Sequence, residues 1–337
     1  MSKRAGFAVI LVASAVVAAL LSLSFGAREM GLVETVDAVR DGLALAFNIE
    51  SGTASEEAQI IAQLRVPRTL LGVLVGAALG TAGALLQGHT RNPLADTNLL
   101  GIGPGAALAV AATTASIGSL PVLVAVGVGF LGATMAVALV FTLSYRSRGS
   151  TPITVVLGGS ALGAVCSAIT SGIVLTNTQS LNEMRFWTAG SVAGRDMHVV
   201  AAVAPVILIG LLAASATASQ VNMLNMGDDV AHALGVNVAA TRAVGILLVA
   251  LLAGAAVAGA GPIGFVGLVV PHLVRSVTGP DYRWVLPCSA LAGATLLLLA
   301  DVAGRIITRP GELQVGITLA FIGAPFALYL LRKGARL

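Results

Sequence analysis

Charged residues are scarce in this sequence. Of its 337 residues, 10% are charged and 57% are hydrophobic, whereas an average soluble domain has about 25% charged residues. The mean hydropathy is +0.95. So few charges cannot cover the surface of a water-soluble fold of this length. The composition therefore excludes a large aqueous domain. It predicts a polytopic membrane protein organised as one transmembrane domain over residues 1–337.

Patterns that carry catalytic or metal chemistry are also missing. The two cysteines, Cys166 and Cys288, lie far apart in apolar surroundings, which is typical of small buried hydrophobic residues and provides no disulfide or metal framework. His272 has no second ligand at a suitable spacing, so we expect no metal site. No G-x-x-x-x-G-K-S/T phosphate loop occurs. We therefore expect a chain that is not an enzyme and that binds no ATP or other cofactor itself.

Long hydrophobic runs dominate what is present. Each is bounded by short polar segments and is read as a membrane-spanning helix. A signal peptide is rejected for the first run, because it is long and further spans follow it. The ten predicted spans are residues 5–25, 66–86, 99–115, 122–145, 152–175, 199–216, 240–260, 263–277, 285–303 and 313–331.

The distribution of charge orients these spans. Eleven basic and four acidic residues fall on the side that holds both termini, a net charge of +7, and the other side has −3, which together make the chain's +4. Basic residues gather on the cytoplasmic side of membrane proteins. Both termini are therefore predicted to be cytoplasmic. The scattered basic residues, despite a pI of 9.6, indicate topology and contact with membrane lipid rather than binding to nucleic acid.

Three segments between the spans are expected to form short helices. Residues 33–47 and part of residues 176–198 are predicted to lie at the outer surface. The sequence GDDVAHALG lies in the inner loop of residues 219–237 and has aspartates at its start and a glycine at its stop. Residues 65–105 organise the rest of the chain. They comprise two arginines around a proline, a glycine- and alanine-rich span that permits close helix packing, a polar turn at residues 87–96, and a second glycine-rich run.

Four segments resemble the signature of the FecCD/BtuC-type permeases of iron-siderophore, haem and cobalamin ABC importers. The segment MRFWTAGS (residues 184–191) is most similar to the ferric-siderophore members. The resemblance covers nearly the whole chain in order. The four segments are RVPRTLLGVLVGAALGTAGALLQGHTRNPLADTNLLGIGPGAALA (65–109), AGPIGFVGLVVPHLVR (260–275), LLLLADVAGR (296–305) and PGELQVGITLAFIGAPFALYLL (310–331).

The resemblance implies a fold and a set of partners. The fold is all-α, with about ten transmembrane helices, as in a type II ABC importer permease. A second permease subunit, identical or related, would complete the pore. Two cytosolic ABC ATPase subunits would carry the ATP and Mg, and a substrate-binding protein would dock outside. The location is the cytoplasmic (inner) membrane.

The resemblance also implies a docking role for Arg65, Arg68 and Arg305, which would receive acidic residues of the binding protein. Arg309 lies close by but matches no motif. The alternative for these arginines is a snorkelling or locally paired side chain. Asp301 precedes Arg305 by four residues and is either a local partner or a functional intramembrane acid.

Three further groups of residues have functional and structural interpretations. For the inner loop, the resemblance implies contact with the ATPase, and the alternative is a simple loop cap. Ser150 and Thr151 either narrow the cytoplasmic gate or cap the helix that begins at Pro152. Phe186 and Trp187 either line the outer pathway or anchor the chain at the membrane surface. The residues implied for ATPase coupling are Asp228, Asp229, Ala231, Leu234 and Gly235.

These observations predict the permease subunit of an ATP-driven importer of ferric siderophores that works by alternating access. Haem or cobalamin is the alternative substrate. A different class, the ion-coupled secondary transporter, needs a cluster of intramembrane carboxylates, and Asp301 is the one candidate. Whether the turn at residues 91–93 contacts the ATPase or only shapes the next helix is left open.

Overall fold

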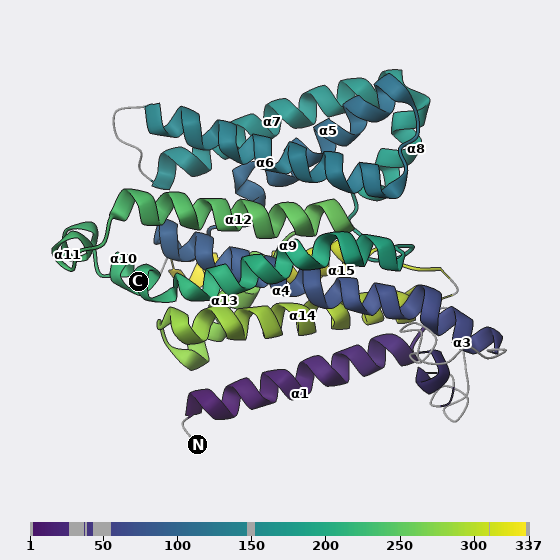
Figure 1. The fold of residues 1–337 in the computed structure, drawn as a ribbon, viewed down its shortest axis with the longest axis horizontal. Coiled ribbons are helices and arrows are strands. Elements are labelled where there is room, and N and C mark those ends of the chain that lie inside the picture. The colour runs from purple at the N-terminus through teal and green to yellow at the C-terminus, as the bar shows by residue number, and fades with distance from the viewer. Residues whose placement is uncertain are drawn as a thin grey trace.

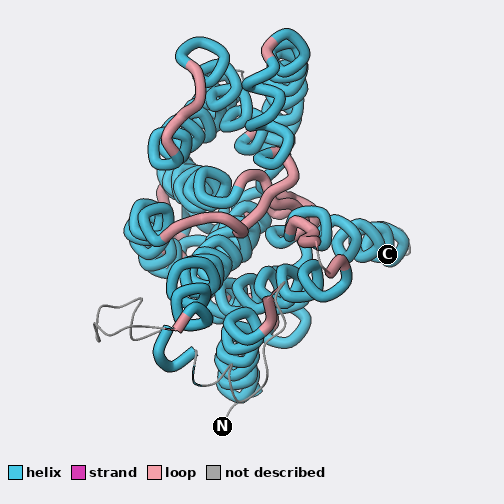
Figure 2. Tube along the Cα trace, turned by 90° about the vertical axis from the view of Figure 1, so that its right-hand side faces the viewer, coloured by secondary structure: helices cyan, strands magenta, loops and turns pink. Residues whose placement is uncertain are grey.

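The computed structural model describes residues 3–26, 37, 39–42, 55–146, 152–309 and 311–334. In this part of the chain every regular element is a helix. Figure 1 shows that most of the helices lie side by side, and Figure 2 views them nearly end on. The elements are α1 (Lys3–Ser24), α3 (Glu56–Ile60), the π-helical η1 (Ile61–Arg65), α4 (Val66–Thr90), the 3-10 helix η2 (Thr97–Leu100), α5 (Ile102–Ile117), α6 (Val122–Arg146), α7 (Pro152–Thr176), α8 (Thr178–Trp187), α9 (Met197–Ala216), α10 (Ala218–Asn225), α11 (Asp228–Ala233), α12 (Val238–Ala260), α13 (Val266–Thr278), α14 (Tyr282–Ile307) and α15 (Val315–Gly334).

Each predicted span coincides with one of these helices. Seven helices are long and apolar enough to cross a membrane, and α5, α13 and α15 are shorter apolar helices. The expected helices in the loops at residues 176–198 and 219–237 are α8 and α11. Most of the helix expected at residues 33–47 falls outside the described residues. The two cysteines are buried, as predicted.

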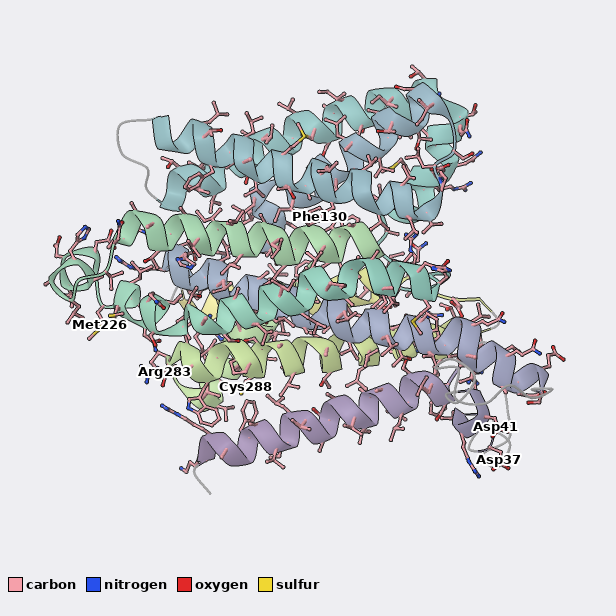
Figure 3. The ribbon with its side chains drawn as sticks, viewed as in Figure 1. Asp37, Asp41, Phe130, Met226, Arg283 and Cys288 are labelled. Carbon is pink, nitrogen blue, oxygen red and sulfur yellow. The ribbon has the colours of Figure 1, made fainter. Side chains whose placement is uncertain are left out.

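The start of α1 and the end of α15 lie at the end of the bundle that carries α11 (Figure 1). We name this the α11 end and the opposite one the α8 end. Figure 3 labels Arg283 and Met226 at the α11 end and Asp37 and Asp41 at the α8 end. The first and the last described helices therefore begin and end, respectively, at the same end of the bundle, which agrees with an even number of spans.

Helix α4 forms the centre of the bundle. It continues α3 and η1 without a break as one 35-residue helix, Glu56–Thr90. Pro67 lacks the N–H that a regular turn requires, and the wider π-helical turn of η1 directly precedes it. Close packing holds α4 in place, because a Cβ added at Gly83 would meet the backbone of Gly267 on α13, and one at Gly76 would meet that of Gly293 on α14.

The polar turn begins later than the sequence predicted. Gln87 and His89 are buried in the last turn of α4, and the helix ends at Arg91. Gln87 Nε2 donates to the Gly267 carbonyl (3.0 Å), and Arg275 donates to Gln87 Oε1. The Gln87 amide is thus satisfied by α13, so it can stay inside the bundle instead of turning out to water.

Candidate functional site

Two clusters of arginine and aspartate lie at opposite ends of α4. The buried cluster comprises Arg65, Arg68, Asp301, Arg305 and Glu312 at the α8 end. The exposed cluster comprises Arg91, Asp228 and Arg242 at the α11 end. The first contains the arginines predicted to dock a binding protein. The second includes the helix predicted to contact an ATPase.

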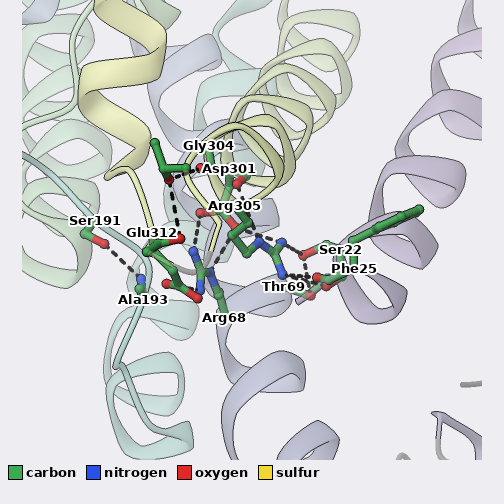
Figure 4. A network of polar contacts seen from close by, with 12 residues as sticks. Ser22, Phe25, Arg68, Thr69, Ser191, Ala193, Asp301, Gly304, Arg305 and Glu312 are labelled. Carbon is green, nitrogen blue, oxygen red and sulfur yellow. Dashed lines mark hydrogen bonds and ion pairs between the residues drawn. The ribbon is translucent and has the colours of Figure 1, made fainter. Parts of the chain in front are cut away.

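Asp301 joins two helices in the buried cluster. Arg68 on α4 donates to both carboxylate oxygens, from Nη2 at 2.8 Å and from Nε at 3.0 Å. Arg305, one turn along α14, pairs with the same carboxylate at 2.9 Å. Figure 4 shows Asp301 between the two guanidinium groups. The local Asp301–Arg305 pair considered from the sequence is therefore present. The long-range contact with Arg68 is an addition that spacing could not reveal.

Arg65 and Arg305 also satisfy the open end of α1. The last carbonyl groups of a helix have no partner within the helix. Arg65 Nη1 donates to the carbonyls of Leu23 (2.8 Å) and Ser24 (2.7 Å), and Arg305 Nη1 donates to that of Ser22 (3.0 Å). The Ser22 hydroxyl also accepts from Arg305 Nη2 at 3.0 Å. Two positive charges at a helix C-terminus are electrostatically favourable, so these arginines fix α1 against α4 and α14.

Three of the four arginines predicted to dock a binding protein are buried and hydrogen-bonded within this chain. Arg65, Arg68 and Arg305 are 5%, 8% and 1% exposed, because their donors are used by carbonyls and carboxylates of this chain. Arg309 is exposed and donates to the Gly26 carbonyl (3.4 Å). Arg68 also pairs at 2.8 Å with Glu312, whose side chain is 35% exposed. The cluster therefore reaches the surface at Glu312 and Arg309.

A cavity of about 580 Å³ opens beside the buried cluster. Arg68 and Glu312 line one part of it, and Glu183, Trp187 and Arg195 line another. Burial lowers the pKa of Arg195. Trp187 thus lines a cavity at the α8 end. The side chain of its neighbour Phe186, and both predicted gate residues, Ser150 and Thr151, fall outside the described residues.

Helix α11 has the form expected from its sequence. Asp228 and Asp229 occupy its first turn, and Gly227 and Gly235 at its two ends adopt positive φ angles of 117° and 83°. Ala231 is fully buried in a small apolar cluster that includes Leu224, Val236 and Val238. Leu234 is 56% exposed. Ala231 therefore packs the helix against the protein, and the side chain of Leu234 is left exposed on its surface.

Two residues beside α11 were not singled out from the sequence. Arg91 and Arg242 both donate to Asp228 Oδ1, the second at 3.0 Å. Arg91 also donates to the Leu224 carbonyl at 2.9 Å. The turn after α4 thus contacts α10 and α11 directly. The signal in the sequence was an arginine in the predicted turn at residues 87–96, but its partner Asp228 lies 137 positions away.

The described residues form no metal-ligand cluster and line a second cavity. Within the described ranges, no group of three or more His, Cys, Asp or Glu side chains could hold a metal ion. A second, apolar cavity of about 610 Å³ lies along α15 and is lined in part by Pro262, Gly316, Phe321 and Pro325.

Comparisons with known proteins place the chain among transport proteins. A model of the FecCD transport family matches residues 14–333. The ferric enterobactin transport system permease protein FepD of Escherichia coli (strain K12) is 40% identical over 327 residues, which cover 95% of this chain and 93% of FepD. The hemin transport system permease protein HmuU of Yersinia pestis is 38% identical over 320 residues, 93% of each protein.

A solved structure matches the fold over almost its full length. It is assigned to a metal-chelate type ABC transporter in an inward-facing conformation. The TM-score is 0.83 at 29% sequence identity, and the match covers 97% of this chain and 98% of that chain.

Proposed function

The chain belongs to the FecCD transport family, and we propose that it is the permease subunit of an ATP-driven ABC importer that carries a ferric siderophore across the cytoplasmic membrane. The observation that carries this proposal is the match to permeases over nearly the whole chain, in sequence and in fold. Its relatives are named as permeases for iron chelates, hemin or cobalamin. Among these, the MRFWTAGS segment favours a ferric siderophore.

The importer would assemble around two permease subunits. ATP and Mg would bind to two ATPase subunits at the α11 end, where Asp228, Asp229, Ala231, Leu234 and Gly235 form the contact. The exposed Leu234 and the buried Ala231 support this, because a short anchored helix with an apolar residue projecting from it suits a cleft in a partner. ATP-driven closure would move α11 and rock the helices between outward- and inward-open states.

A substrate-binding protein would dock at the α8 end. The four arginines there face two carboxylates, Asp301 and Glu312, so the group has an excess of positive charge. Arg309 and the exposed edge of Arg68 would meet acidic residues of the partner, and Arg65 and Arg305 would hold that edge in place. A partner carboxylate could replace Glu312 on Arg68, because this pair is partly open to water and is easily exchanged. The ligand would then pass Trp187 and Phe186, and Ser150 and Thr151 would line the cytoplasmic gate.

Reconstitution tests this function. The permease is coexpressed with its ATPase and binding protein and placed in proteoliposomes that contain ATP. We expect uptake of ferric enterobactin to depend on all components, whereas uptake of hemin or cobalamin instead would reassign the substrate. Transport by the permease alone, driven by an ion gradient, would contradict the proposal. That outcome is disfavoured because Asp301, the acid such a mechanism needs, is paired with both Arg68 and Arg305.

Docking is tested separately with Arg309→Glu, since Arg309 is exposed and its reversal leaves the buried pairs intact. We expect the binding protein to stimulate ATP hydrolysis at least about tenfold more weakly, mostly through slower association. Arg283→Glu, at the opposite end of the bundle, is the matched control. Equal stimulation of both variants would remove Arg309 from the docking surface.

A further inference from the structure

We propose that Arg91 and Arg242 are positioning residues. They fix α11 to the ends of α4 and α12 because both donate hydrogen bonds to one carboxylate oxygen of Asp228. This inference rests on the proposed function, in which α11 receives the movement of an ATPase. The two arginines are assigned a role in transmitting that movement to the bundle.

The geometry joins three parts of the chain at one carboxylate. Arg91 follows the last residue of α4, and Arg242 lies near the start of α12. Both donate to Asp228 Oδ1 in the first turn of α11. Arg91 also donates to the Leu224 carbonyl of α10. Helix α11 therefore cannot shift as a unit without pulling on α4 and α12 or breaking these bonds.

The backbone at Arg91 supports a role for its side chain. Arg91 has φ 50° and ψ 30°, the left-handed region. Glycine adopts this conformation without strain, whereas an arginine is destabilised there. Among the described residues, the one other non-glycine residue with positive φ is Phe265. A strained residue of this kind is retained where its side chain is needed, and here the side chain holds Asp228.

Little else holds α11 in place. Ala231 is its one fully buried side chain among the described residues, and Leu234 and Val230 are 56% and 43% exposed. The glycines at both of its ends have positive φ and few neighbours, and a Cβ added at Gly227 or Gly235 would meet nothing within 4 Å. No side chain of the bundle therefore packs against the glycine at either end of the helix. The direction of α11 then depends on Ala231 and on the charge cluster.

The link has a consequence for the far end of the bundle. Arg91 lies at one end of the continuous helix Glu56–Thr90, and Arg68 lies near the other. Because α4 is closely packed against α13 and α14 at Gly83 and Gly76, a pull at Arg91 would move α4 together with these two helices. The exposed cluster would thereby couple the ATPase side to the buried cluster on the docking side.

The test compares Arg91→Gly, Arg91→Lys and Asp228→Asn in the complete importer, with Arg283→Ala as a matched charge control at the same end. Arg91→Gly removes the hydrogen bond to Asp228, and glycine adopts the left-handed backbone conformation of this position without strain. We therefore expect the unfolding temperature of this variant to stay close to that of the wild type. ATP-driven transport should fall about tenfold, within the range of measured coupling energies. Arg91→Lys should restore part of it, and Arg283→Ala should transport as the wild type does.

A distance measurement tests the contact between Arg91 and Asp228 independently of a transport assay. Spin labels at Ala233 and Leu94, both exposed, report the separation between α11 and the turn after α4. We expect a narrow distance distribution in the wild type and a broad one in Arg91→Gly and Asp228→Asn. Unchanged distributions, or wild-type transport in both variants, would overturn the inference. If the wild-type importer moves no siderophore, the proposed function fails, and the distances still decide whether the arginines hold α11.

Discussion

The buried and the exposed clusters use the same chemistry in opposite surroundings. In each, two arginines share one aspartate, and one arginine belongs to or directly follows α4. Asp301 is 1% exposed, whereas the side chain of Asp228 is 40% exposed. A buried charge left without a partner is strongly destabilising, whereas an exposed pair contributes little to stability. The pairs of Asp301 should therefore contribute more to the stability of the fold than the pairs of Asp228.

The largest effect is expected from breaking the buried cluster. Asp301→Asn leaves the buried guanidinium group of Arg305 without its paired carboxylate and leaves Arg68 with Glu312 alone. We expect it to destabilise the protein by roughly 3–5 kcal/mol, measured by thermal unfolding of the purified protein in detergent. Asp228→Asn, the same change in the exposed cluster, should cost about 1 kcal/mol or less. Equal losses in the two variants would contradict the distinction between the clusters.

A smaller effect should follow from disturbing the helix that connects the two ends. Gly83→Ala places a methyl group against the backbone of Gly267 on α13, and such overpacking typically costs about 1–3 kcal/mol. Gly127 on α6 is the matched control, since a Cβ added there would meet nothing within 4 Å. Gly127→Ala should stabilise α6 by up to about 1 kcal/mol, because alanine has the higher helix propensity. Glycine-to-alanine substitution should therefore lower the stability at residue 83 and raise it at residue 127, as measured by thermal unfolding in detergent. A change of the same sign at both sites would contradict the close packing of α4.

The smallest effect is expected at the α11 end outside the exposed cluster. Asp281 caps α14 by accepting from the Arg283 backbone N–H (3.1 Å) and also accepts from Asn222 Nδ2 (2.8 Å). Asp281→Ala should cost about 1 kcal/mol, the usual loss for a helix cap. Asn222→Ala removes the hydrogen bond between α10 and Asp281 but keeps the helix cap, so comparing the two variants gives the contribution of each contact.

The pH dependence of this loss follows from the pKa of Asp281. The hydrogen bond from Asn222, more than any other contact, holds this pKa below its usual range. A lowered pKa means that the carboxylate stabilises the folded state fully above its unfolded pKa of about 3.9 and loses that contribution as the pH falls through the folded value. The difference in unfolding temperature between the wild type and Asp281→Ala should therefore be largest near neutral pH and shrink in acid. A difference that grows in acid would refute this assignment.

The ten spans and the two loop helices could be predicted because a bilayer leaves the chain few choices. Long apolar runs must satisfy their backbone groups within a helix. The break after α12 is also explained locally, because Gly261 adopts φ 74° there. The end of α4 was misplaced because Gln87 is polar, and only the carbonyl of Gly267, 180 positions away, shows why it stays inside the helix.

The candidate sites were harder to predict than the helices. From the sequence, Arg65, Arg68 and Arg305 could either dock a binding protein or be paired locally. The sequence could not show that Asp301, Glu312 and the carbonyls at the end of α1 would converge on them. The partnership of Arg91 with Asp228 was hidden for the same reason.

By itself, the sequence of this protein determined its membrane character, its helices, its family and the shared side of its termini, since these depend on hydrophobic length, charge bias and local motifs. Only the tertiary structure decided which charges are buried, which carboxylate each arginine holds and how α4 joins the two ends. The decisive contacts, Arg68 with Asp301 and Arg91 with Asp228, join residues 233 and 137 positions apart. The free energy of burying a charge depends on such distant neighbours, which a local sequence pattern does not identify.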